Sequence, residues 1–260
     1  MKVLVCYKWV LDEADISINV DDLSLNFEKA KYKISEYDRN AIELGAKLQE
    51  SNGCTLHAAT IGHGVKASAN DVLSRGPEEV FYIDNVKLEN TDSAVTAKLL
   101  AGIAKKIGDI GIIICGNGSS DFYSQQVGPR LAALLGYPSV SYATSVKLNG
   151  SEIIAERKLE DGSEYIKVKG PAVISILPEI NKPRIPGLKQ ILAAKKKPST
   201  SISLEEIGIT ESEIGTPIEV KKVIAAVMDR KQTRIGCDDM NAAEIASILV
   251  KQFQSDGIIN

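Results

Sequence analysis

The chain has 260 residues, 44% hydrophobic and 25% charged, which is ordinary for a globular protein and excludes disordered, collagenous and disulfide-scaffold classes. The formal net charge of −3 argues against nucleic acid as a partner, and no run of about 18 apolar residues is present that could span a membrane. Because the sequence starts directly with the apolar strand pattern of residues 3–7, without a signal or transit segment, we expect a cytoplasmic protein.

Predicted strands and helices alternate along the first half of the chain. β-Branched or continuously apolar runs predict strands at 3–7, 55–61, 80–83 and 110–115. Ser35 to Asp38 has the pattern of a capping box, which predicts the start of a helix that buries Ala41, Leu44, Ala46 and Leu48. Further helices are predicted from Gly64 to Arg75, from Thr91 or Asp92 to about Ile107, and from about Tyr123 to Leu135. This repetition predicts an α/β fold, a parallel twisted sheet with helices on both faces.

After Pro138 the pattern changes to short alternating stretches at 141–147, 153–159, 164–168 and 172–176. The turn pairs Asn149-Gly150 and Asp161-Gly162 separate them, which predicts an antiparallel hairpin addition to the sheet.

The remainder of the chain is poor in core signals. We expect a helix over 188–197 and a last helix over about 241–253; the basic run that ends the first of them (Lys195 to Lys197) is predicted to be solvated, with a docking role as the alternative. The sequence therefore predicts an α/β domain over 1–197 and an extended C-terminal arm, 198–260, that packs on a partner subunit.

The strongest candidate for a binding site is the Gly/Ser loop Gly116–Asp121, which follows a buried strand and precedes Gln125-Gln126-Val127-Gly128. In an open α/β sheet, ligands bind where strands end and helices begin. Glycines let backbone N–H groups approach a phosphate, and the following helix N-terminus favours negative charge. The alternative is an ordinary connection, and the loop lacks the Gly-Lys-Ser/Thr end of a Walker A motif.

Two weaker candidates lie after the other strands. Gly62-His63-Gly64-Val65-Lys66-Ala67 fits a dinucleotide-binding pattern, with Asp84 twenty residues beyond Gly64, but a tight turn without ligand is the favoured interpretation. Lys8, Trp9 and Asp12 follow the first strand and are uninformative alone.

The residue types exclude several chemistries. The four cysteines are scattered without a Cys-x-x-Cys pair, and there are only two histidines, so we expect neither an iron–sulfur cluster nor a zinc site. No Ser-His-Asp or Cys-His arrangement can be built, so hydrolase functions are disfavoured. Any redox chemistry must be carried by a bound organic cofactor.

Several long motifs carry a family resemblance. The stretches 155–166 (AERKLEDGSEYI), 170–175 (GPAVIS) and 181–188 (NKPRIPGL) resemble the signature of the electron transfer flavoprotein β subunit, as do 3–10 and 116–128. The similarity covers about residues 1–210. The stretches 34–41 and 71–77 are most similar to the bacterial branch associated with carnitine metabolism and nitrogen fixation, although Ser35-Glu36 replaces an Asn-Pro pair of many members.

The resemblance implies an adenine-nucleotide-hydrolase-like fold and a heterodimer. An α subunit would hold FAD that exchanges electrons with acyl-CoA or other flavin dehydrogenases, and this chain would hold AMP or, in electron-bifurcating members that use NAD(H), a second FAD. Tyr37 would lie near the partner's flavin. Carried over by position, the nucleotide site would comprise Cys6, Ser35, Glu36, Tyr37, Asp38, Ile61, Gly62, Gly116, Asn117, Gly118, Ser119, Ser120, Asp121, Gln125, Gln126, Val127 and Gly128.

The resemblance also implies that residues 181–197 dock dehydrogenases, with Asn181, Pro183, Arg184, Pro186 and Leu188 as contacts and Leu188 as the apolar anchor. The alternative for Leu188 is a helix residue packed on its own domain. Three functions remain open: an electron carrier subunit, a bifurcating component that oxidises NADH at an FAD in this chain, and a nucleotide-binding module without redox function. The signature at 155–175 argues against the third.

Overall fold

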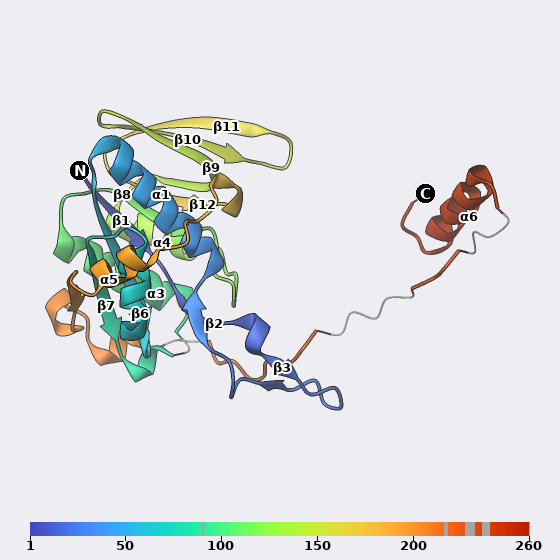
Figure 1. The fold of residues 1–260 in the computed structure, drawn as a ribbon, viewed down its shortest axis with the longest axis horizontal. Helices are drawn as coiled ribbons and strands as arrows, with labels where there is room; N and C mark the ends of the chain where they lie inside the picture. Colours follow the sequence, from blue (N-terminus) through green and yellow to red (C-terminus); the bar gives the residue numbers. More distant parts are fainter. Residues whose placement is uncertain (90, 216–217, 227–231, 236–239, 260) are drawn as a thin grey trace.

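A nine-stranded, mostly parallel sheet forms the centre of the fold (Figure 1). The computed structural model describes residues 1–260 except 90, 216–217, 227–231, 236–239 and 260; Cys237 therefore lies outside the described residues. The strand order is β11-β10-β9-β12-β8-β1-β6-β7-β13. These strands are β1 (Lys2–Cys6), β6 (Thr55–Gly62), β7 (Glu79–Asp84), β8 (Ile110–Gly116), β9 (Ser139–Asn149), β10 (Glu152–Lys158), β11 (Ser163–Lys169), β12 (Ala172–Ile176) and β13 (Ser199–Ser201).

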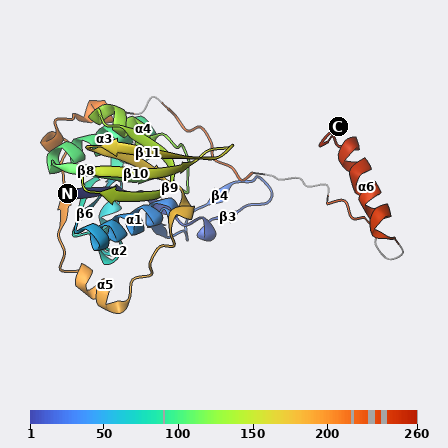
Figure 2. The same ribbon diagram turned by 90° about the horizontal axis from the view of Figure 1, so that it is seen from above.

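Helices cover both faces of the sheet, which confirms the predicted α/β fold. Figure 2 shows α1 and α2 on one side and α3 and α4 on the other. The helices are α1 (Glu36–Asn52), α2 (Ala69–Ser74), α3 (Ser93–Ile107), α4 (Val127–Leu135), α5 (Leu188–Ala194) and α6 (Ala242–Ser255). None of them, within the described part of the chain, has the length and hydrophobicity needed to cross a membrane.

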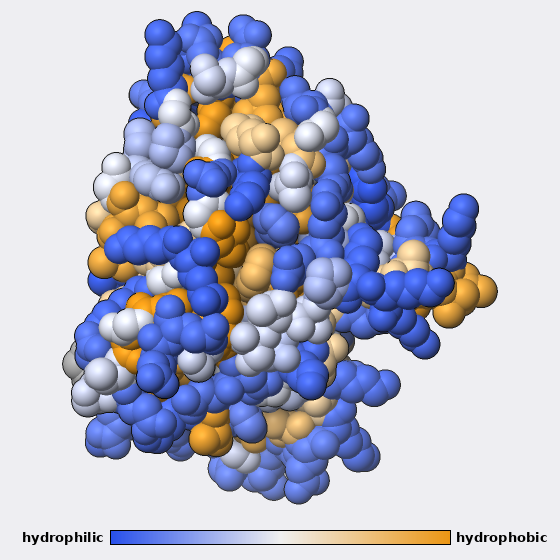
Figure 3. All heavy atoms as spheres, turned by 90° about the vertical axis from the view of Figure 1, so that its left-hand side faces the viewer, coloured by the Kyte–Doolittle hydropathy of each residue, from blue (hydrophilic) through white to orange (hydrophobic). Residues whose placement is uncertain are grey.

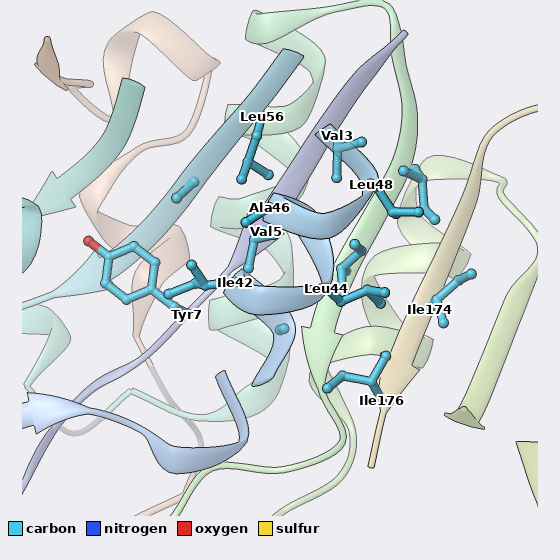
Figure 4. Close-up of a cluster of buried hydrophobic side chains, with 14 of the residues drawn as sticks. Val3, Val5, Tyr7, Ile42, Leu44, Ala46, Leu48, Leu56, Ile174 and Ile176 are labelled. Atoms are coloured by element: carbon cyan, nitrogen blue, oxygen red, sulfur yellow. The ribbon is translucent and has the colours of Figure 1, made fainter. Parts of the chain in front are cut away.

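Successive side chains of β1 point to opposite faces of the sheet, and those on both faces are buried. Val3 and Val5 pack with α1, whose Ala41, Leu44, Ala46 and Leu48 are buried as predicted (Figure 4). Leu4 and Cys6 belong to the second cluster, with residues of α3 and α4. Outside these clusters the side of the molecule seen in Figure 3 is largely hydrophilic, with hydrophobic side chains gathered in separate patches.

The predicted hairpin addition is confirmed for three strands and wrong for the fourth. β9, β10 and β11 form an antiparallel meander with turns at the predicted Asn-Gly and Asp-Gly pairs. β12, by contrast, is inserted between β9 and β8 and is parallel to both. All five of its residues are buried, as expected for an interior parallel strand rather than for an exposed hairpin.

The sheet extends past the expected domain boundary at residue 198. β13 pairs with β7 in parallel, and the buried Ile202, Ile209 and Ile214 complete the core on the α3 side. The expectation that everything after residue 197 lacks a core is therefore wrong for residues 199–214. In both ribbon views α6 lies apart from the sheet, and none of its residues is buried (Figures 1 and 2).

Candidate functional site

The topology creates a crevice at the carboxyl end of the sheet. From the central strand β1 the chain continues to β6 on one side, whereas β8 adds on the other side, so the strand order reverses between β1 and β8. Ligands of open α/β sheets bind at such a switch point. A cavity of about 470 Å³ lies there. Its lining includes the strand ends at Cys6, Ile61 and Cys115.

Asp38, at the start of α1, joins the two strand ends. Its Oδ2 accepts a hydrogen bond from the backbone N–H of Lys8 (2.8 Å), and its Oδ1 accepts one from the N–H of Gly116 (3.1 Å). Burial raises the pKa of Asp38 to about 7 and outweighs these two donors, which favour the charged form. One buried carboxyl group thus fixes both loops that border the cavity.

This geometry predicts a pH dependence of stability. An unfolded aspartate titrates near pH 4, so between about pH 4 and pH 7 the folded protein holds a proton that the unfolded chain has lost, and the contribution of this group to stability falls as the pH rises. Relative to the non-titrating Asp38→Asn variant, the wild type should lose about 2–4 kcal/mol of unfolding free energy over that range. Urea unfolding of both proteins across the pH series measures this, and a constant difference would contradict it.

The loop after β8 approaches α1 closely. A Cβ on Gly116 would lie 2.6 Å from Asp38 Oδ1 and 2.8 Å from Tyr37 Cβ, so only glycine fits there. The N–H of Ser120 donates to Ser35 Oγ (3.2 Å). The predicted capping box is therefore wrong: Ser35 occupies the N-cap position of α1, but its side chain makes no cap hydrogen bond and holds the loop instead.

The helix after this loop starts later than predicted. α4 begins at Val127 rather than near Tyr123, because Tyr123 (φ +47°) and Gln125 (φ +58°) adopt the left-handed conformation. The Tyr123 ring packs on Tyr37, with ring centroids 5.1 Å apart. The extra irregular residues enlarge the loop at the cavity rim.

Two polar side-chain atoms at the cavity are buried without a hydrogen-bond partner among the described residues: Asn117 Nδ2 and Thr91 Oγ1. Asn117 is 5% exposed, and its backbone N–H is already used by the carbonyl of Ile176 (2.9 Å). An unpaired buried amide is costly, so a native partner for it is expected. A ligand with oxygen acceptors, such as a nucleotide, fits this position.

Cationic groups also border the cavity, at Lys8 and Arg130. The Lys8 ammonium pairs with Asp121, and this charge, together with hydrogen bonds, holds the pKa of Asp121 below its usual range although burial alone would raise it. Arg130 Nε donates to Gln126 Oε1 (2.8 Å). Their positive charges suit an anionic ligand.

Most of the sequence-predicted residues converge on the cavity. Eleven of them line it: Cys6, Asp38, Ile61, Gly62, Gly116, Asn117, Gly118, Ser119, Gln125, Gln126 and Val127. The other predicted residues, Ser35, Glu36, Tyr37, Ser120, Asp121 and Gly128, are not part of the lining; Ser35, Tyr37 and Asp121 support the loop, and Glu36 is exposed. Gly128 serves packing, since a Cβ there would lie 2.1 Å from Ser175 Oγ on β12.

Sequence reasoning missed several lining residues. Trp9, which was noted in the sequence but not assigned to the site, stacks on Tyr32, and both line the cavity; the ring centroids are 6.2 Å apart and the interplanar angle is 15°. They come from β2 (Trp9–Leu11) and β5 (Tyr32–Ile34), which form a separate antiparallel pair. Arg130, Thr91, Ile218 and Val220 carried no pattern that could have identified them.

The Gly62–Ala67 corner is a self-contained turn. Asp84, the expected ribose ligand, accepts hydrogen bonds from the backbone N–H of Gly64 (2.8 Å) and of Lys66 (3.2 Å). Its carboxylate is thereby engaged by the turn itself and does not line the cavity. The geometry argues against a ribose ligand at Asp84, but Gly62, His63 and Val65 of this corner line the cavity, so the interpretation as a turn without a ligand stays a prediction.

Residues 181–197, which we name the docking segment after the role that the resemblance implies, are held to the body at both ends. Asn181 exchanges amide hydrogen bonds with Asn40 (2.8–3.2 Å). The Arg184 guanidinium binds the buried Glu43 (Nε–Oε2, 2.7 Å) and Glu50 (Nη1–Oε1, 2.5 Å). At the other end, Lys197 Nζ donates to the carbonyls of residues 73, 76 and 77 (2.7–3.1 Å). Lys197 is therefore a helix-capping group rather than part of a solvated basic run.

The docking segment offers apolar side chains to solvent between these anchors. Leu188 is 72% exposed, and Ile185 and Leu192 are also exposed, so Leu188 is not packed on its own domain. The resemblance assigns Asn181 and Arg184 to partner contacts, but their polar groups form hydrogen bonds and an ion pair with residues of α1. Pro183 and Pro186 are half-buried and restrict φ between the anchors.

Comparison with known families gives one match over most of this fold. The model of the electron transfer flavoprotein domain matches residues 22–207. This range contains α1, the loop after β8, the antiparallel meander, the docking segment and β13.

Proposed function

The chain belongs to the electron transfer flavoprotein family, and from this premise we propose that it is the β subunit, which with an α subunit relays electrons between flavin dehydrogenases and an acceptor. One observation carries the assignment of a nucleotide to this chain: the switch-point cavity with the unpaired, buried Asn117 amide at its wall. When bound, AMP would be structural, whereas FAD would supply one- or two-electron chemistry.

The residues present fit a nucleotide. Gly116, whose N–H is bound by Asp38, keeps the loop close to α1. The N–H groups of the following loop would hold phosphate oxygens, with Lys8 and Arg130 supplying positive charge. Asn117 Nδ2 would donate to the ligand. Asp38 would keep the two bordering loops at their spacing, because it accepts hydrogen bonds from both.

The second candidate is an electron-bifurcating subunit that binds FAD here and exchanges hydride with NAD(H). The observation that favours it is the stacked Trp9–Tyr32 pair in the cavity lining, since such a surface suits a planar aromatic ring. The Gly62–Gly64 corner does not add to this candidate, because the turn uses Asp84 internally.

The partner proposals rest on exposed apolar surfaces. The dehydrogenase, an acyl-CoA or other flavin dehydrogenase, would contact the docking segment at Leu188. The α subunit would cover α6, whose Ile248, Leu249 and Val250 are exposed on a helix that is properly capped by Asn241. A capped amphipathic helix with no buried residue of its own is typical of a segment that folds against a partner.

Counting released nucleotides tests the assignment. We expect the purified complex, once denatured, to yield one AMP or one FAD per copy of this chain in addition to the FAD of the α subunit. Trp9, the only tryptophan, lines the cavity, so FAD binding to this chain alone should quench its fluorescence. A complex with flavin in the α subunit but no second nucleotide would contradict the proposal.

A further inference from the structure

Cys6 and Cys115 lie side by side at the floor of the cavity. They are direct register partners on the adjacent parallel strands β1 and β8, and both line the cavity. Register partners in parallel strands point to the same face of the sheet, and both residues belong to the same core cluster. Each is 4% exposed, so the cavity is the side from which a small reagent would reach them.

The spacing of the sheet suits a bond between the two sulfur atoms. Neighbouring strands are about 4.8 Å apart, and disulfides span Cα–Cα distances of about 4.4–6.8 Å. No change of strand pairing is therefore required to bring the two thiols into bonding range. Cys54, the third described cysteine, is equally buried but has no cysteine opposite it and does not line the cavity.

We propose that Cys6 and Cys115 form an oxidisable dithiol, which a small peroxide converts to a disulfide when the cavity is open and which a bound nucleotide shields. The dithiol itself is independent of the proposed function; the shielding rests on it. The site is thus a modification site for two-electron oxidants that reports on the occupancy of the cavity.

The reaction balances without another cofactor. One thiol, as its thiolate, attacks a peroxide oxygen; the O–O bond breaks, one water leaves and a sulfenic acid forms. The second thiol attacks that sulfur, the S–S bond forms and a second water leaves. Two S–H bonds are lost, the dithiol gives up two electrons and two protons, and one hydrogen peroxide becomes two waters.

The surroundings keep the pair reduced at rest. The hydrogen bond with Cys115 and burial raise the pKa of the Cys6 thiol well above its ordinary value, with the nearby charge of Asp38 acting in the same direction. Because the thiolate is the reactive form, oxidation should be slow at neutral pH and faster in alkali. This separates the pair from a catalytic disulfide, which requires an acidic thiol.

The test uses the full chain with Cys237→Ser, so that only the three described cysteines remain. Hydrogen peroxide is added to the nucleotide-free protein, free thiols are alkylated, and unreduced peptides are analysed by mass spectrometry. We expect a linked Cys6–Cys115 peptide and an alkylated Cys54. Cys6→Ala and Cys115→Ala should abolish the link, whereas the matched control Cys54→Ala should retain it.

A second arm adds AMP or FAD, with binding verified by equilibrium dialysis and, for FAD, by Trp9 fluorescence. A bound nucleotide should slow the link at least about tenfold, the change expected when only about one-tenth of the cavities are open at any time. A sulfinic acid on either residue without a link, or a link to Cys54, would overturn the dithiol. An unchanged rate with nucleotide demonstrably bound would overturn the shielding. Failure of both nucleotides to bind would instead refute the proposed nucleotide site, while the link in the first arm would still establish the dithiol.

Discussion

Replacing Gly118 by valine should empty the cavity of nucleotide while leaving the sheet folded. A Cβ at this position would lie 2.4 Å from Tyr123 Cδ2 and 2.7 Å from its Cε2, so the ring must move. The ring packs against Tyr37, and the Tyr123 backbone already has a left-handed φ, so the displacement should pass into the loop that borders the cavity. We expect affinity for AMP or FAD to fall at least about 100-fold, equivalent to about 2.7 kcal/mol.

Gly162→Val is the matched control, because Gly162 lies in the β10–β11 turn and a Cβ there meets no atom within 4 Å. Affinity is measured by equilibrium dialysis, and stability is compared between nucleotide-free proteins, since bound nucleotide itself raises the melting temperature. Full nucleotide occupancy in a folded Gly118→Val variant would refute the assignment of this loop.

The interior strands of the sheet were predictable because each of them is a run of apolar residues in the sequence. β1, β6, β7 and β8 each combine β-branched residues with burial, and the helices between them have turn signals at their ends. The position of β12 was not predictable in this way. Its five buried residues fit a parallel or an antiparallel neighbour equally well, and the pairing with β8 joins residues about sixty positions apart.

The site was only partly predictable, for a related reason. The Gly/Ser loop is recognisable from its own composition. The left-handed backbone of Tyr123 and Gln125 is not, because neither residue type favours a positive φ. Asp38 was placed at the site by resemblance; its bridge between the ends of β1 and β8 depends on how α1 docks, which no local pattern encodes. The same holds for Arg184, whose partners Glu43 and Glu50 lie on α1, more than 130 positions away in sequence.

Replacing Leu188 by alanine should slow electron transfer from the partner dehydrogenase without affecting nucleotide content or stability. The side chain is exposed on a segment that Arg184 and Lys197 hold at its two ends, so little conformational entropy is lost when it docks. Full burial of a leucine in a partner pocket contributes about 1.5–3 kcal/mol. The apparent kcat/KM for the dehydrogenase should therefore fall about 10- to 100-fold, whereas the unfolding free energy should change by less than about 0.5 kcal/mol.

Tyr165→Ala provides the matched control. Tyr165 is 75% exposed, close to the exposure of Leu188, but lies on the edge strand β11, outside the docking segment. If the dehydrogenase recognises the docking segment and not any exposed apolar side chain, replacing Tyr165 should leave the transfer kinetics unchanged. Both variants are assayed as complexes with the α subunit, by stopped-flow reduction of the flavin and by thermal unfolding of the same preparation. Unchanged kinetics for Leu188→Ala, with or without a loss of stability, would remove Leu188 from the docking surface and would direct attention to the neighbouring exposed Ile185 and Leu192.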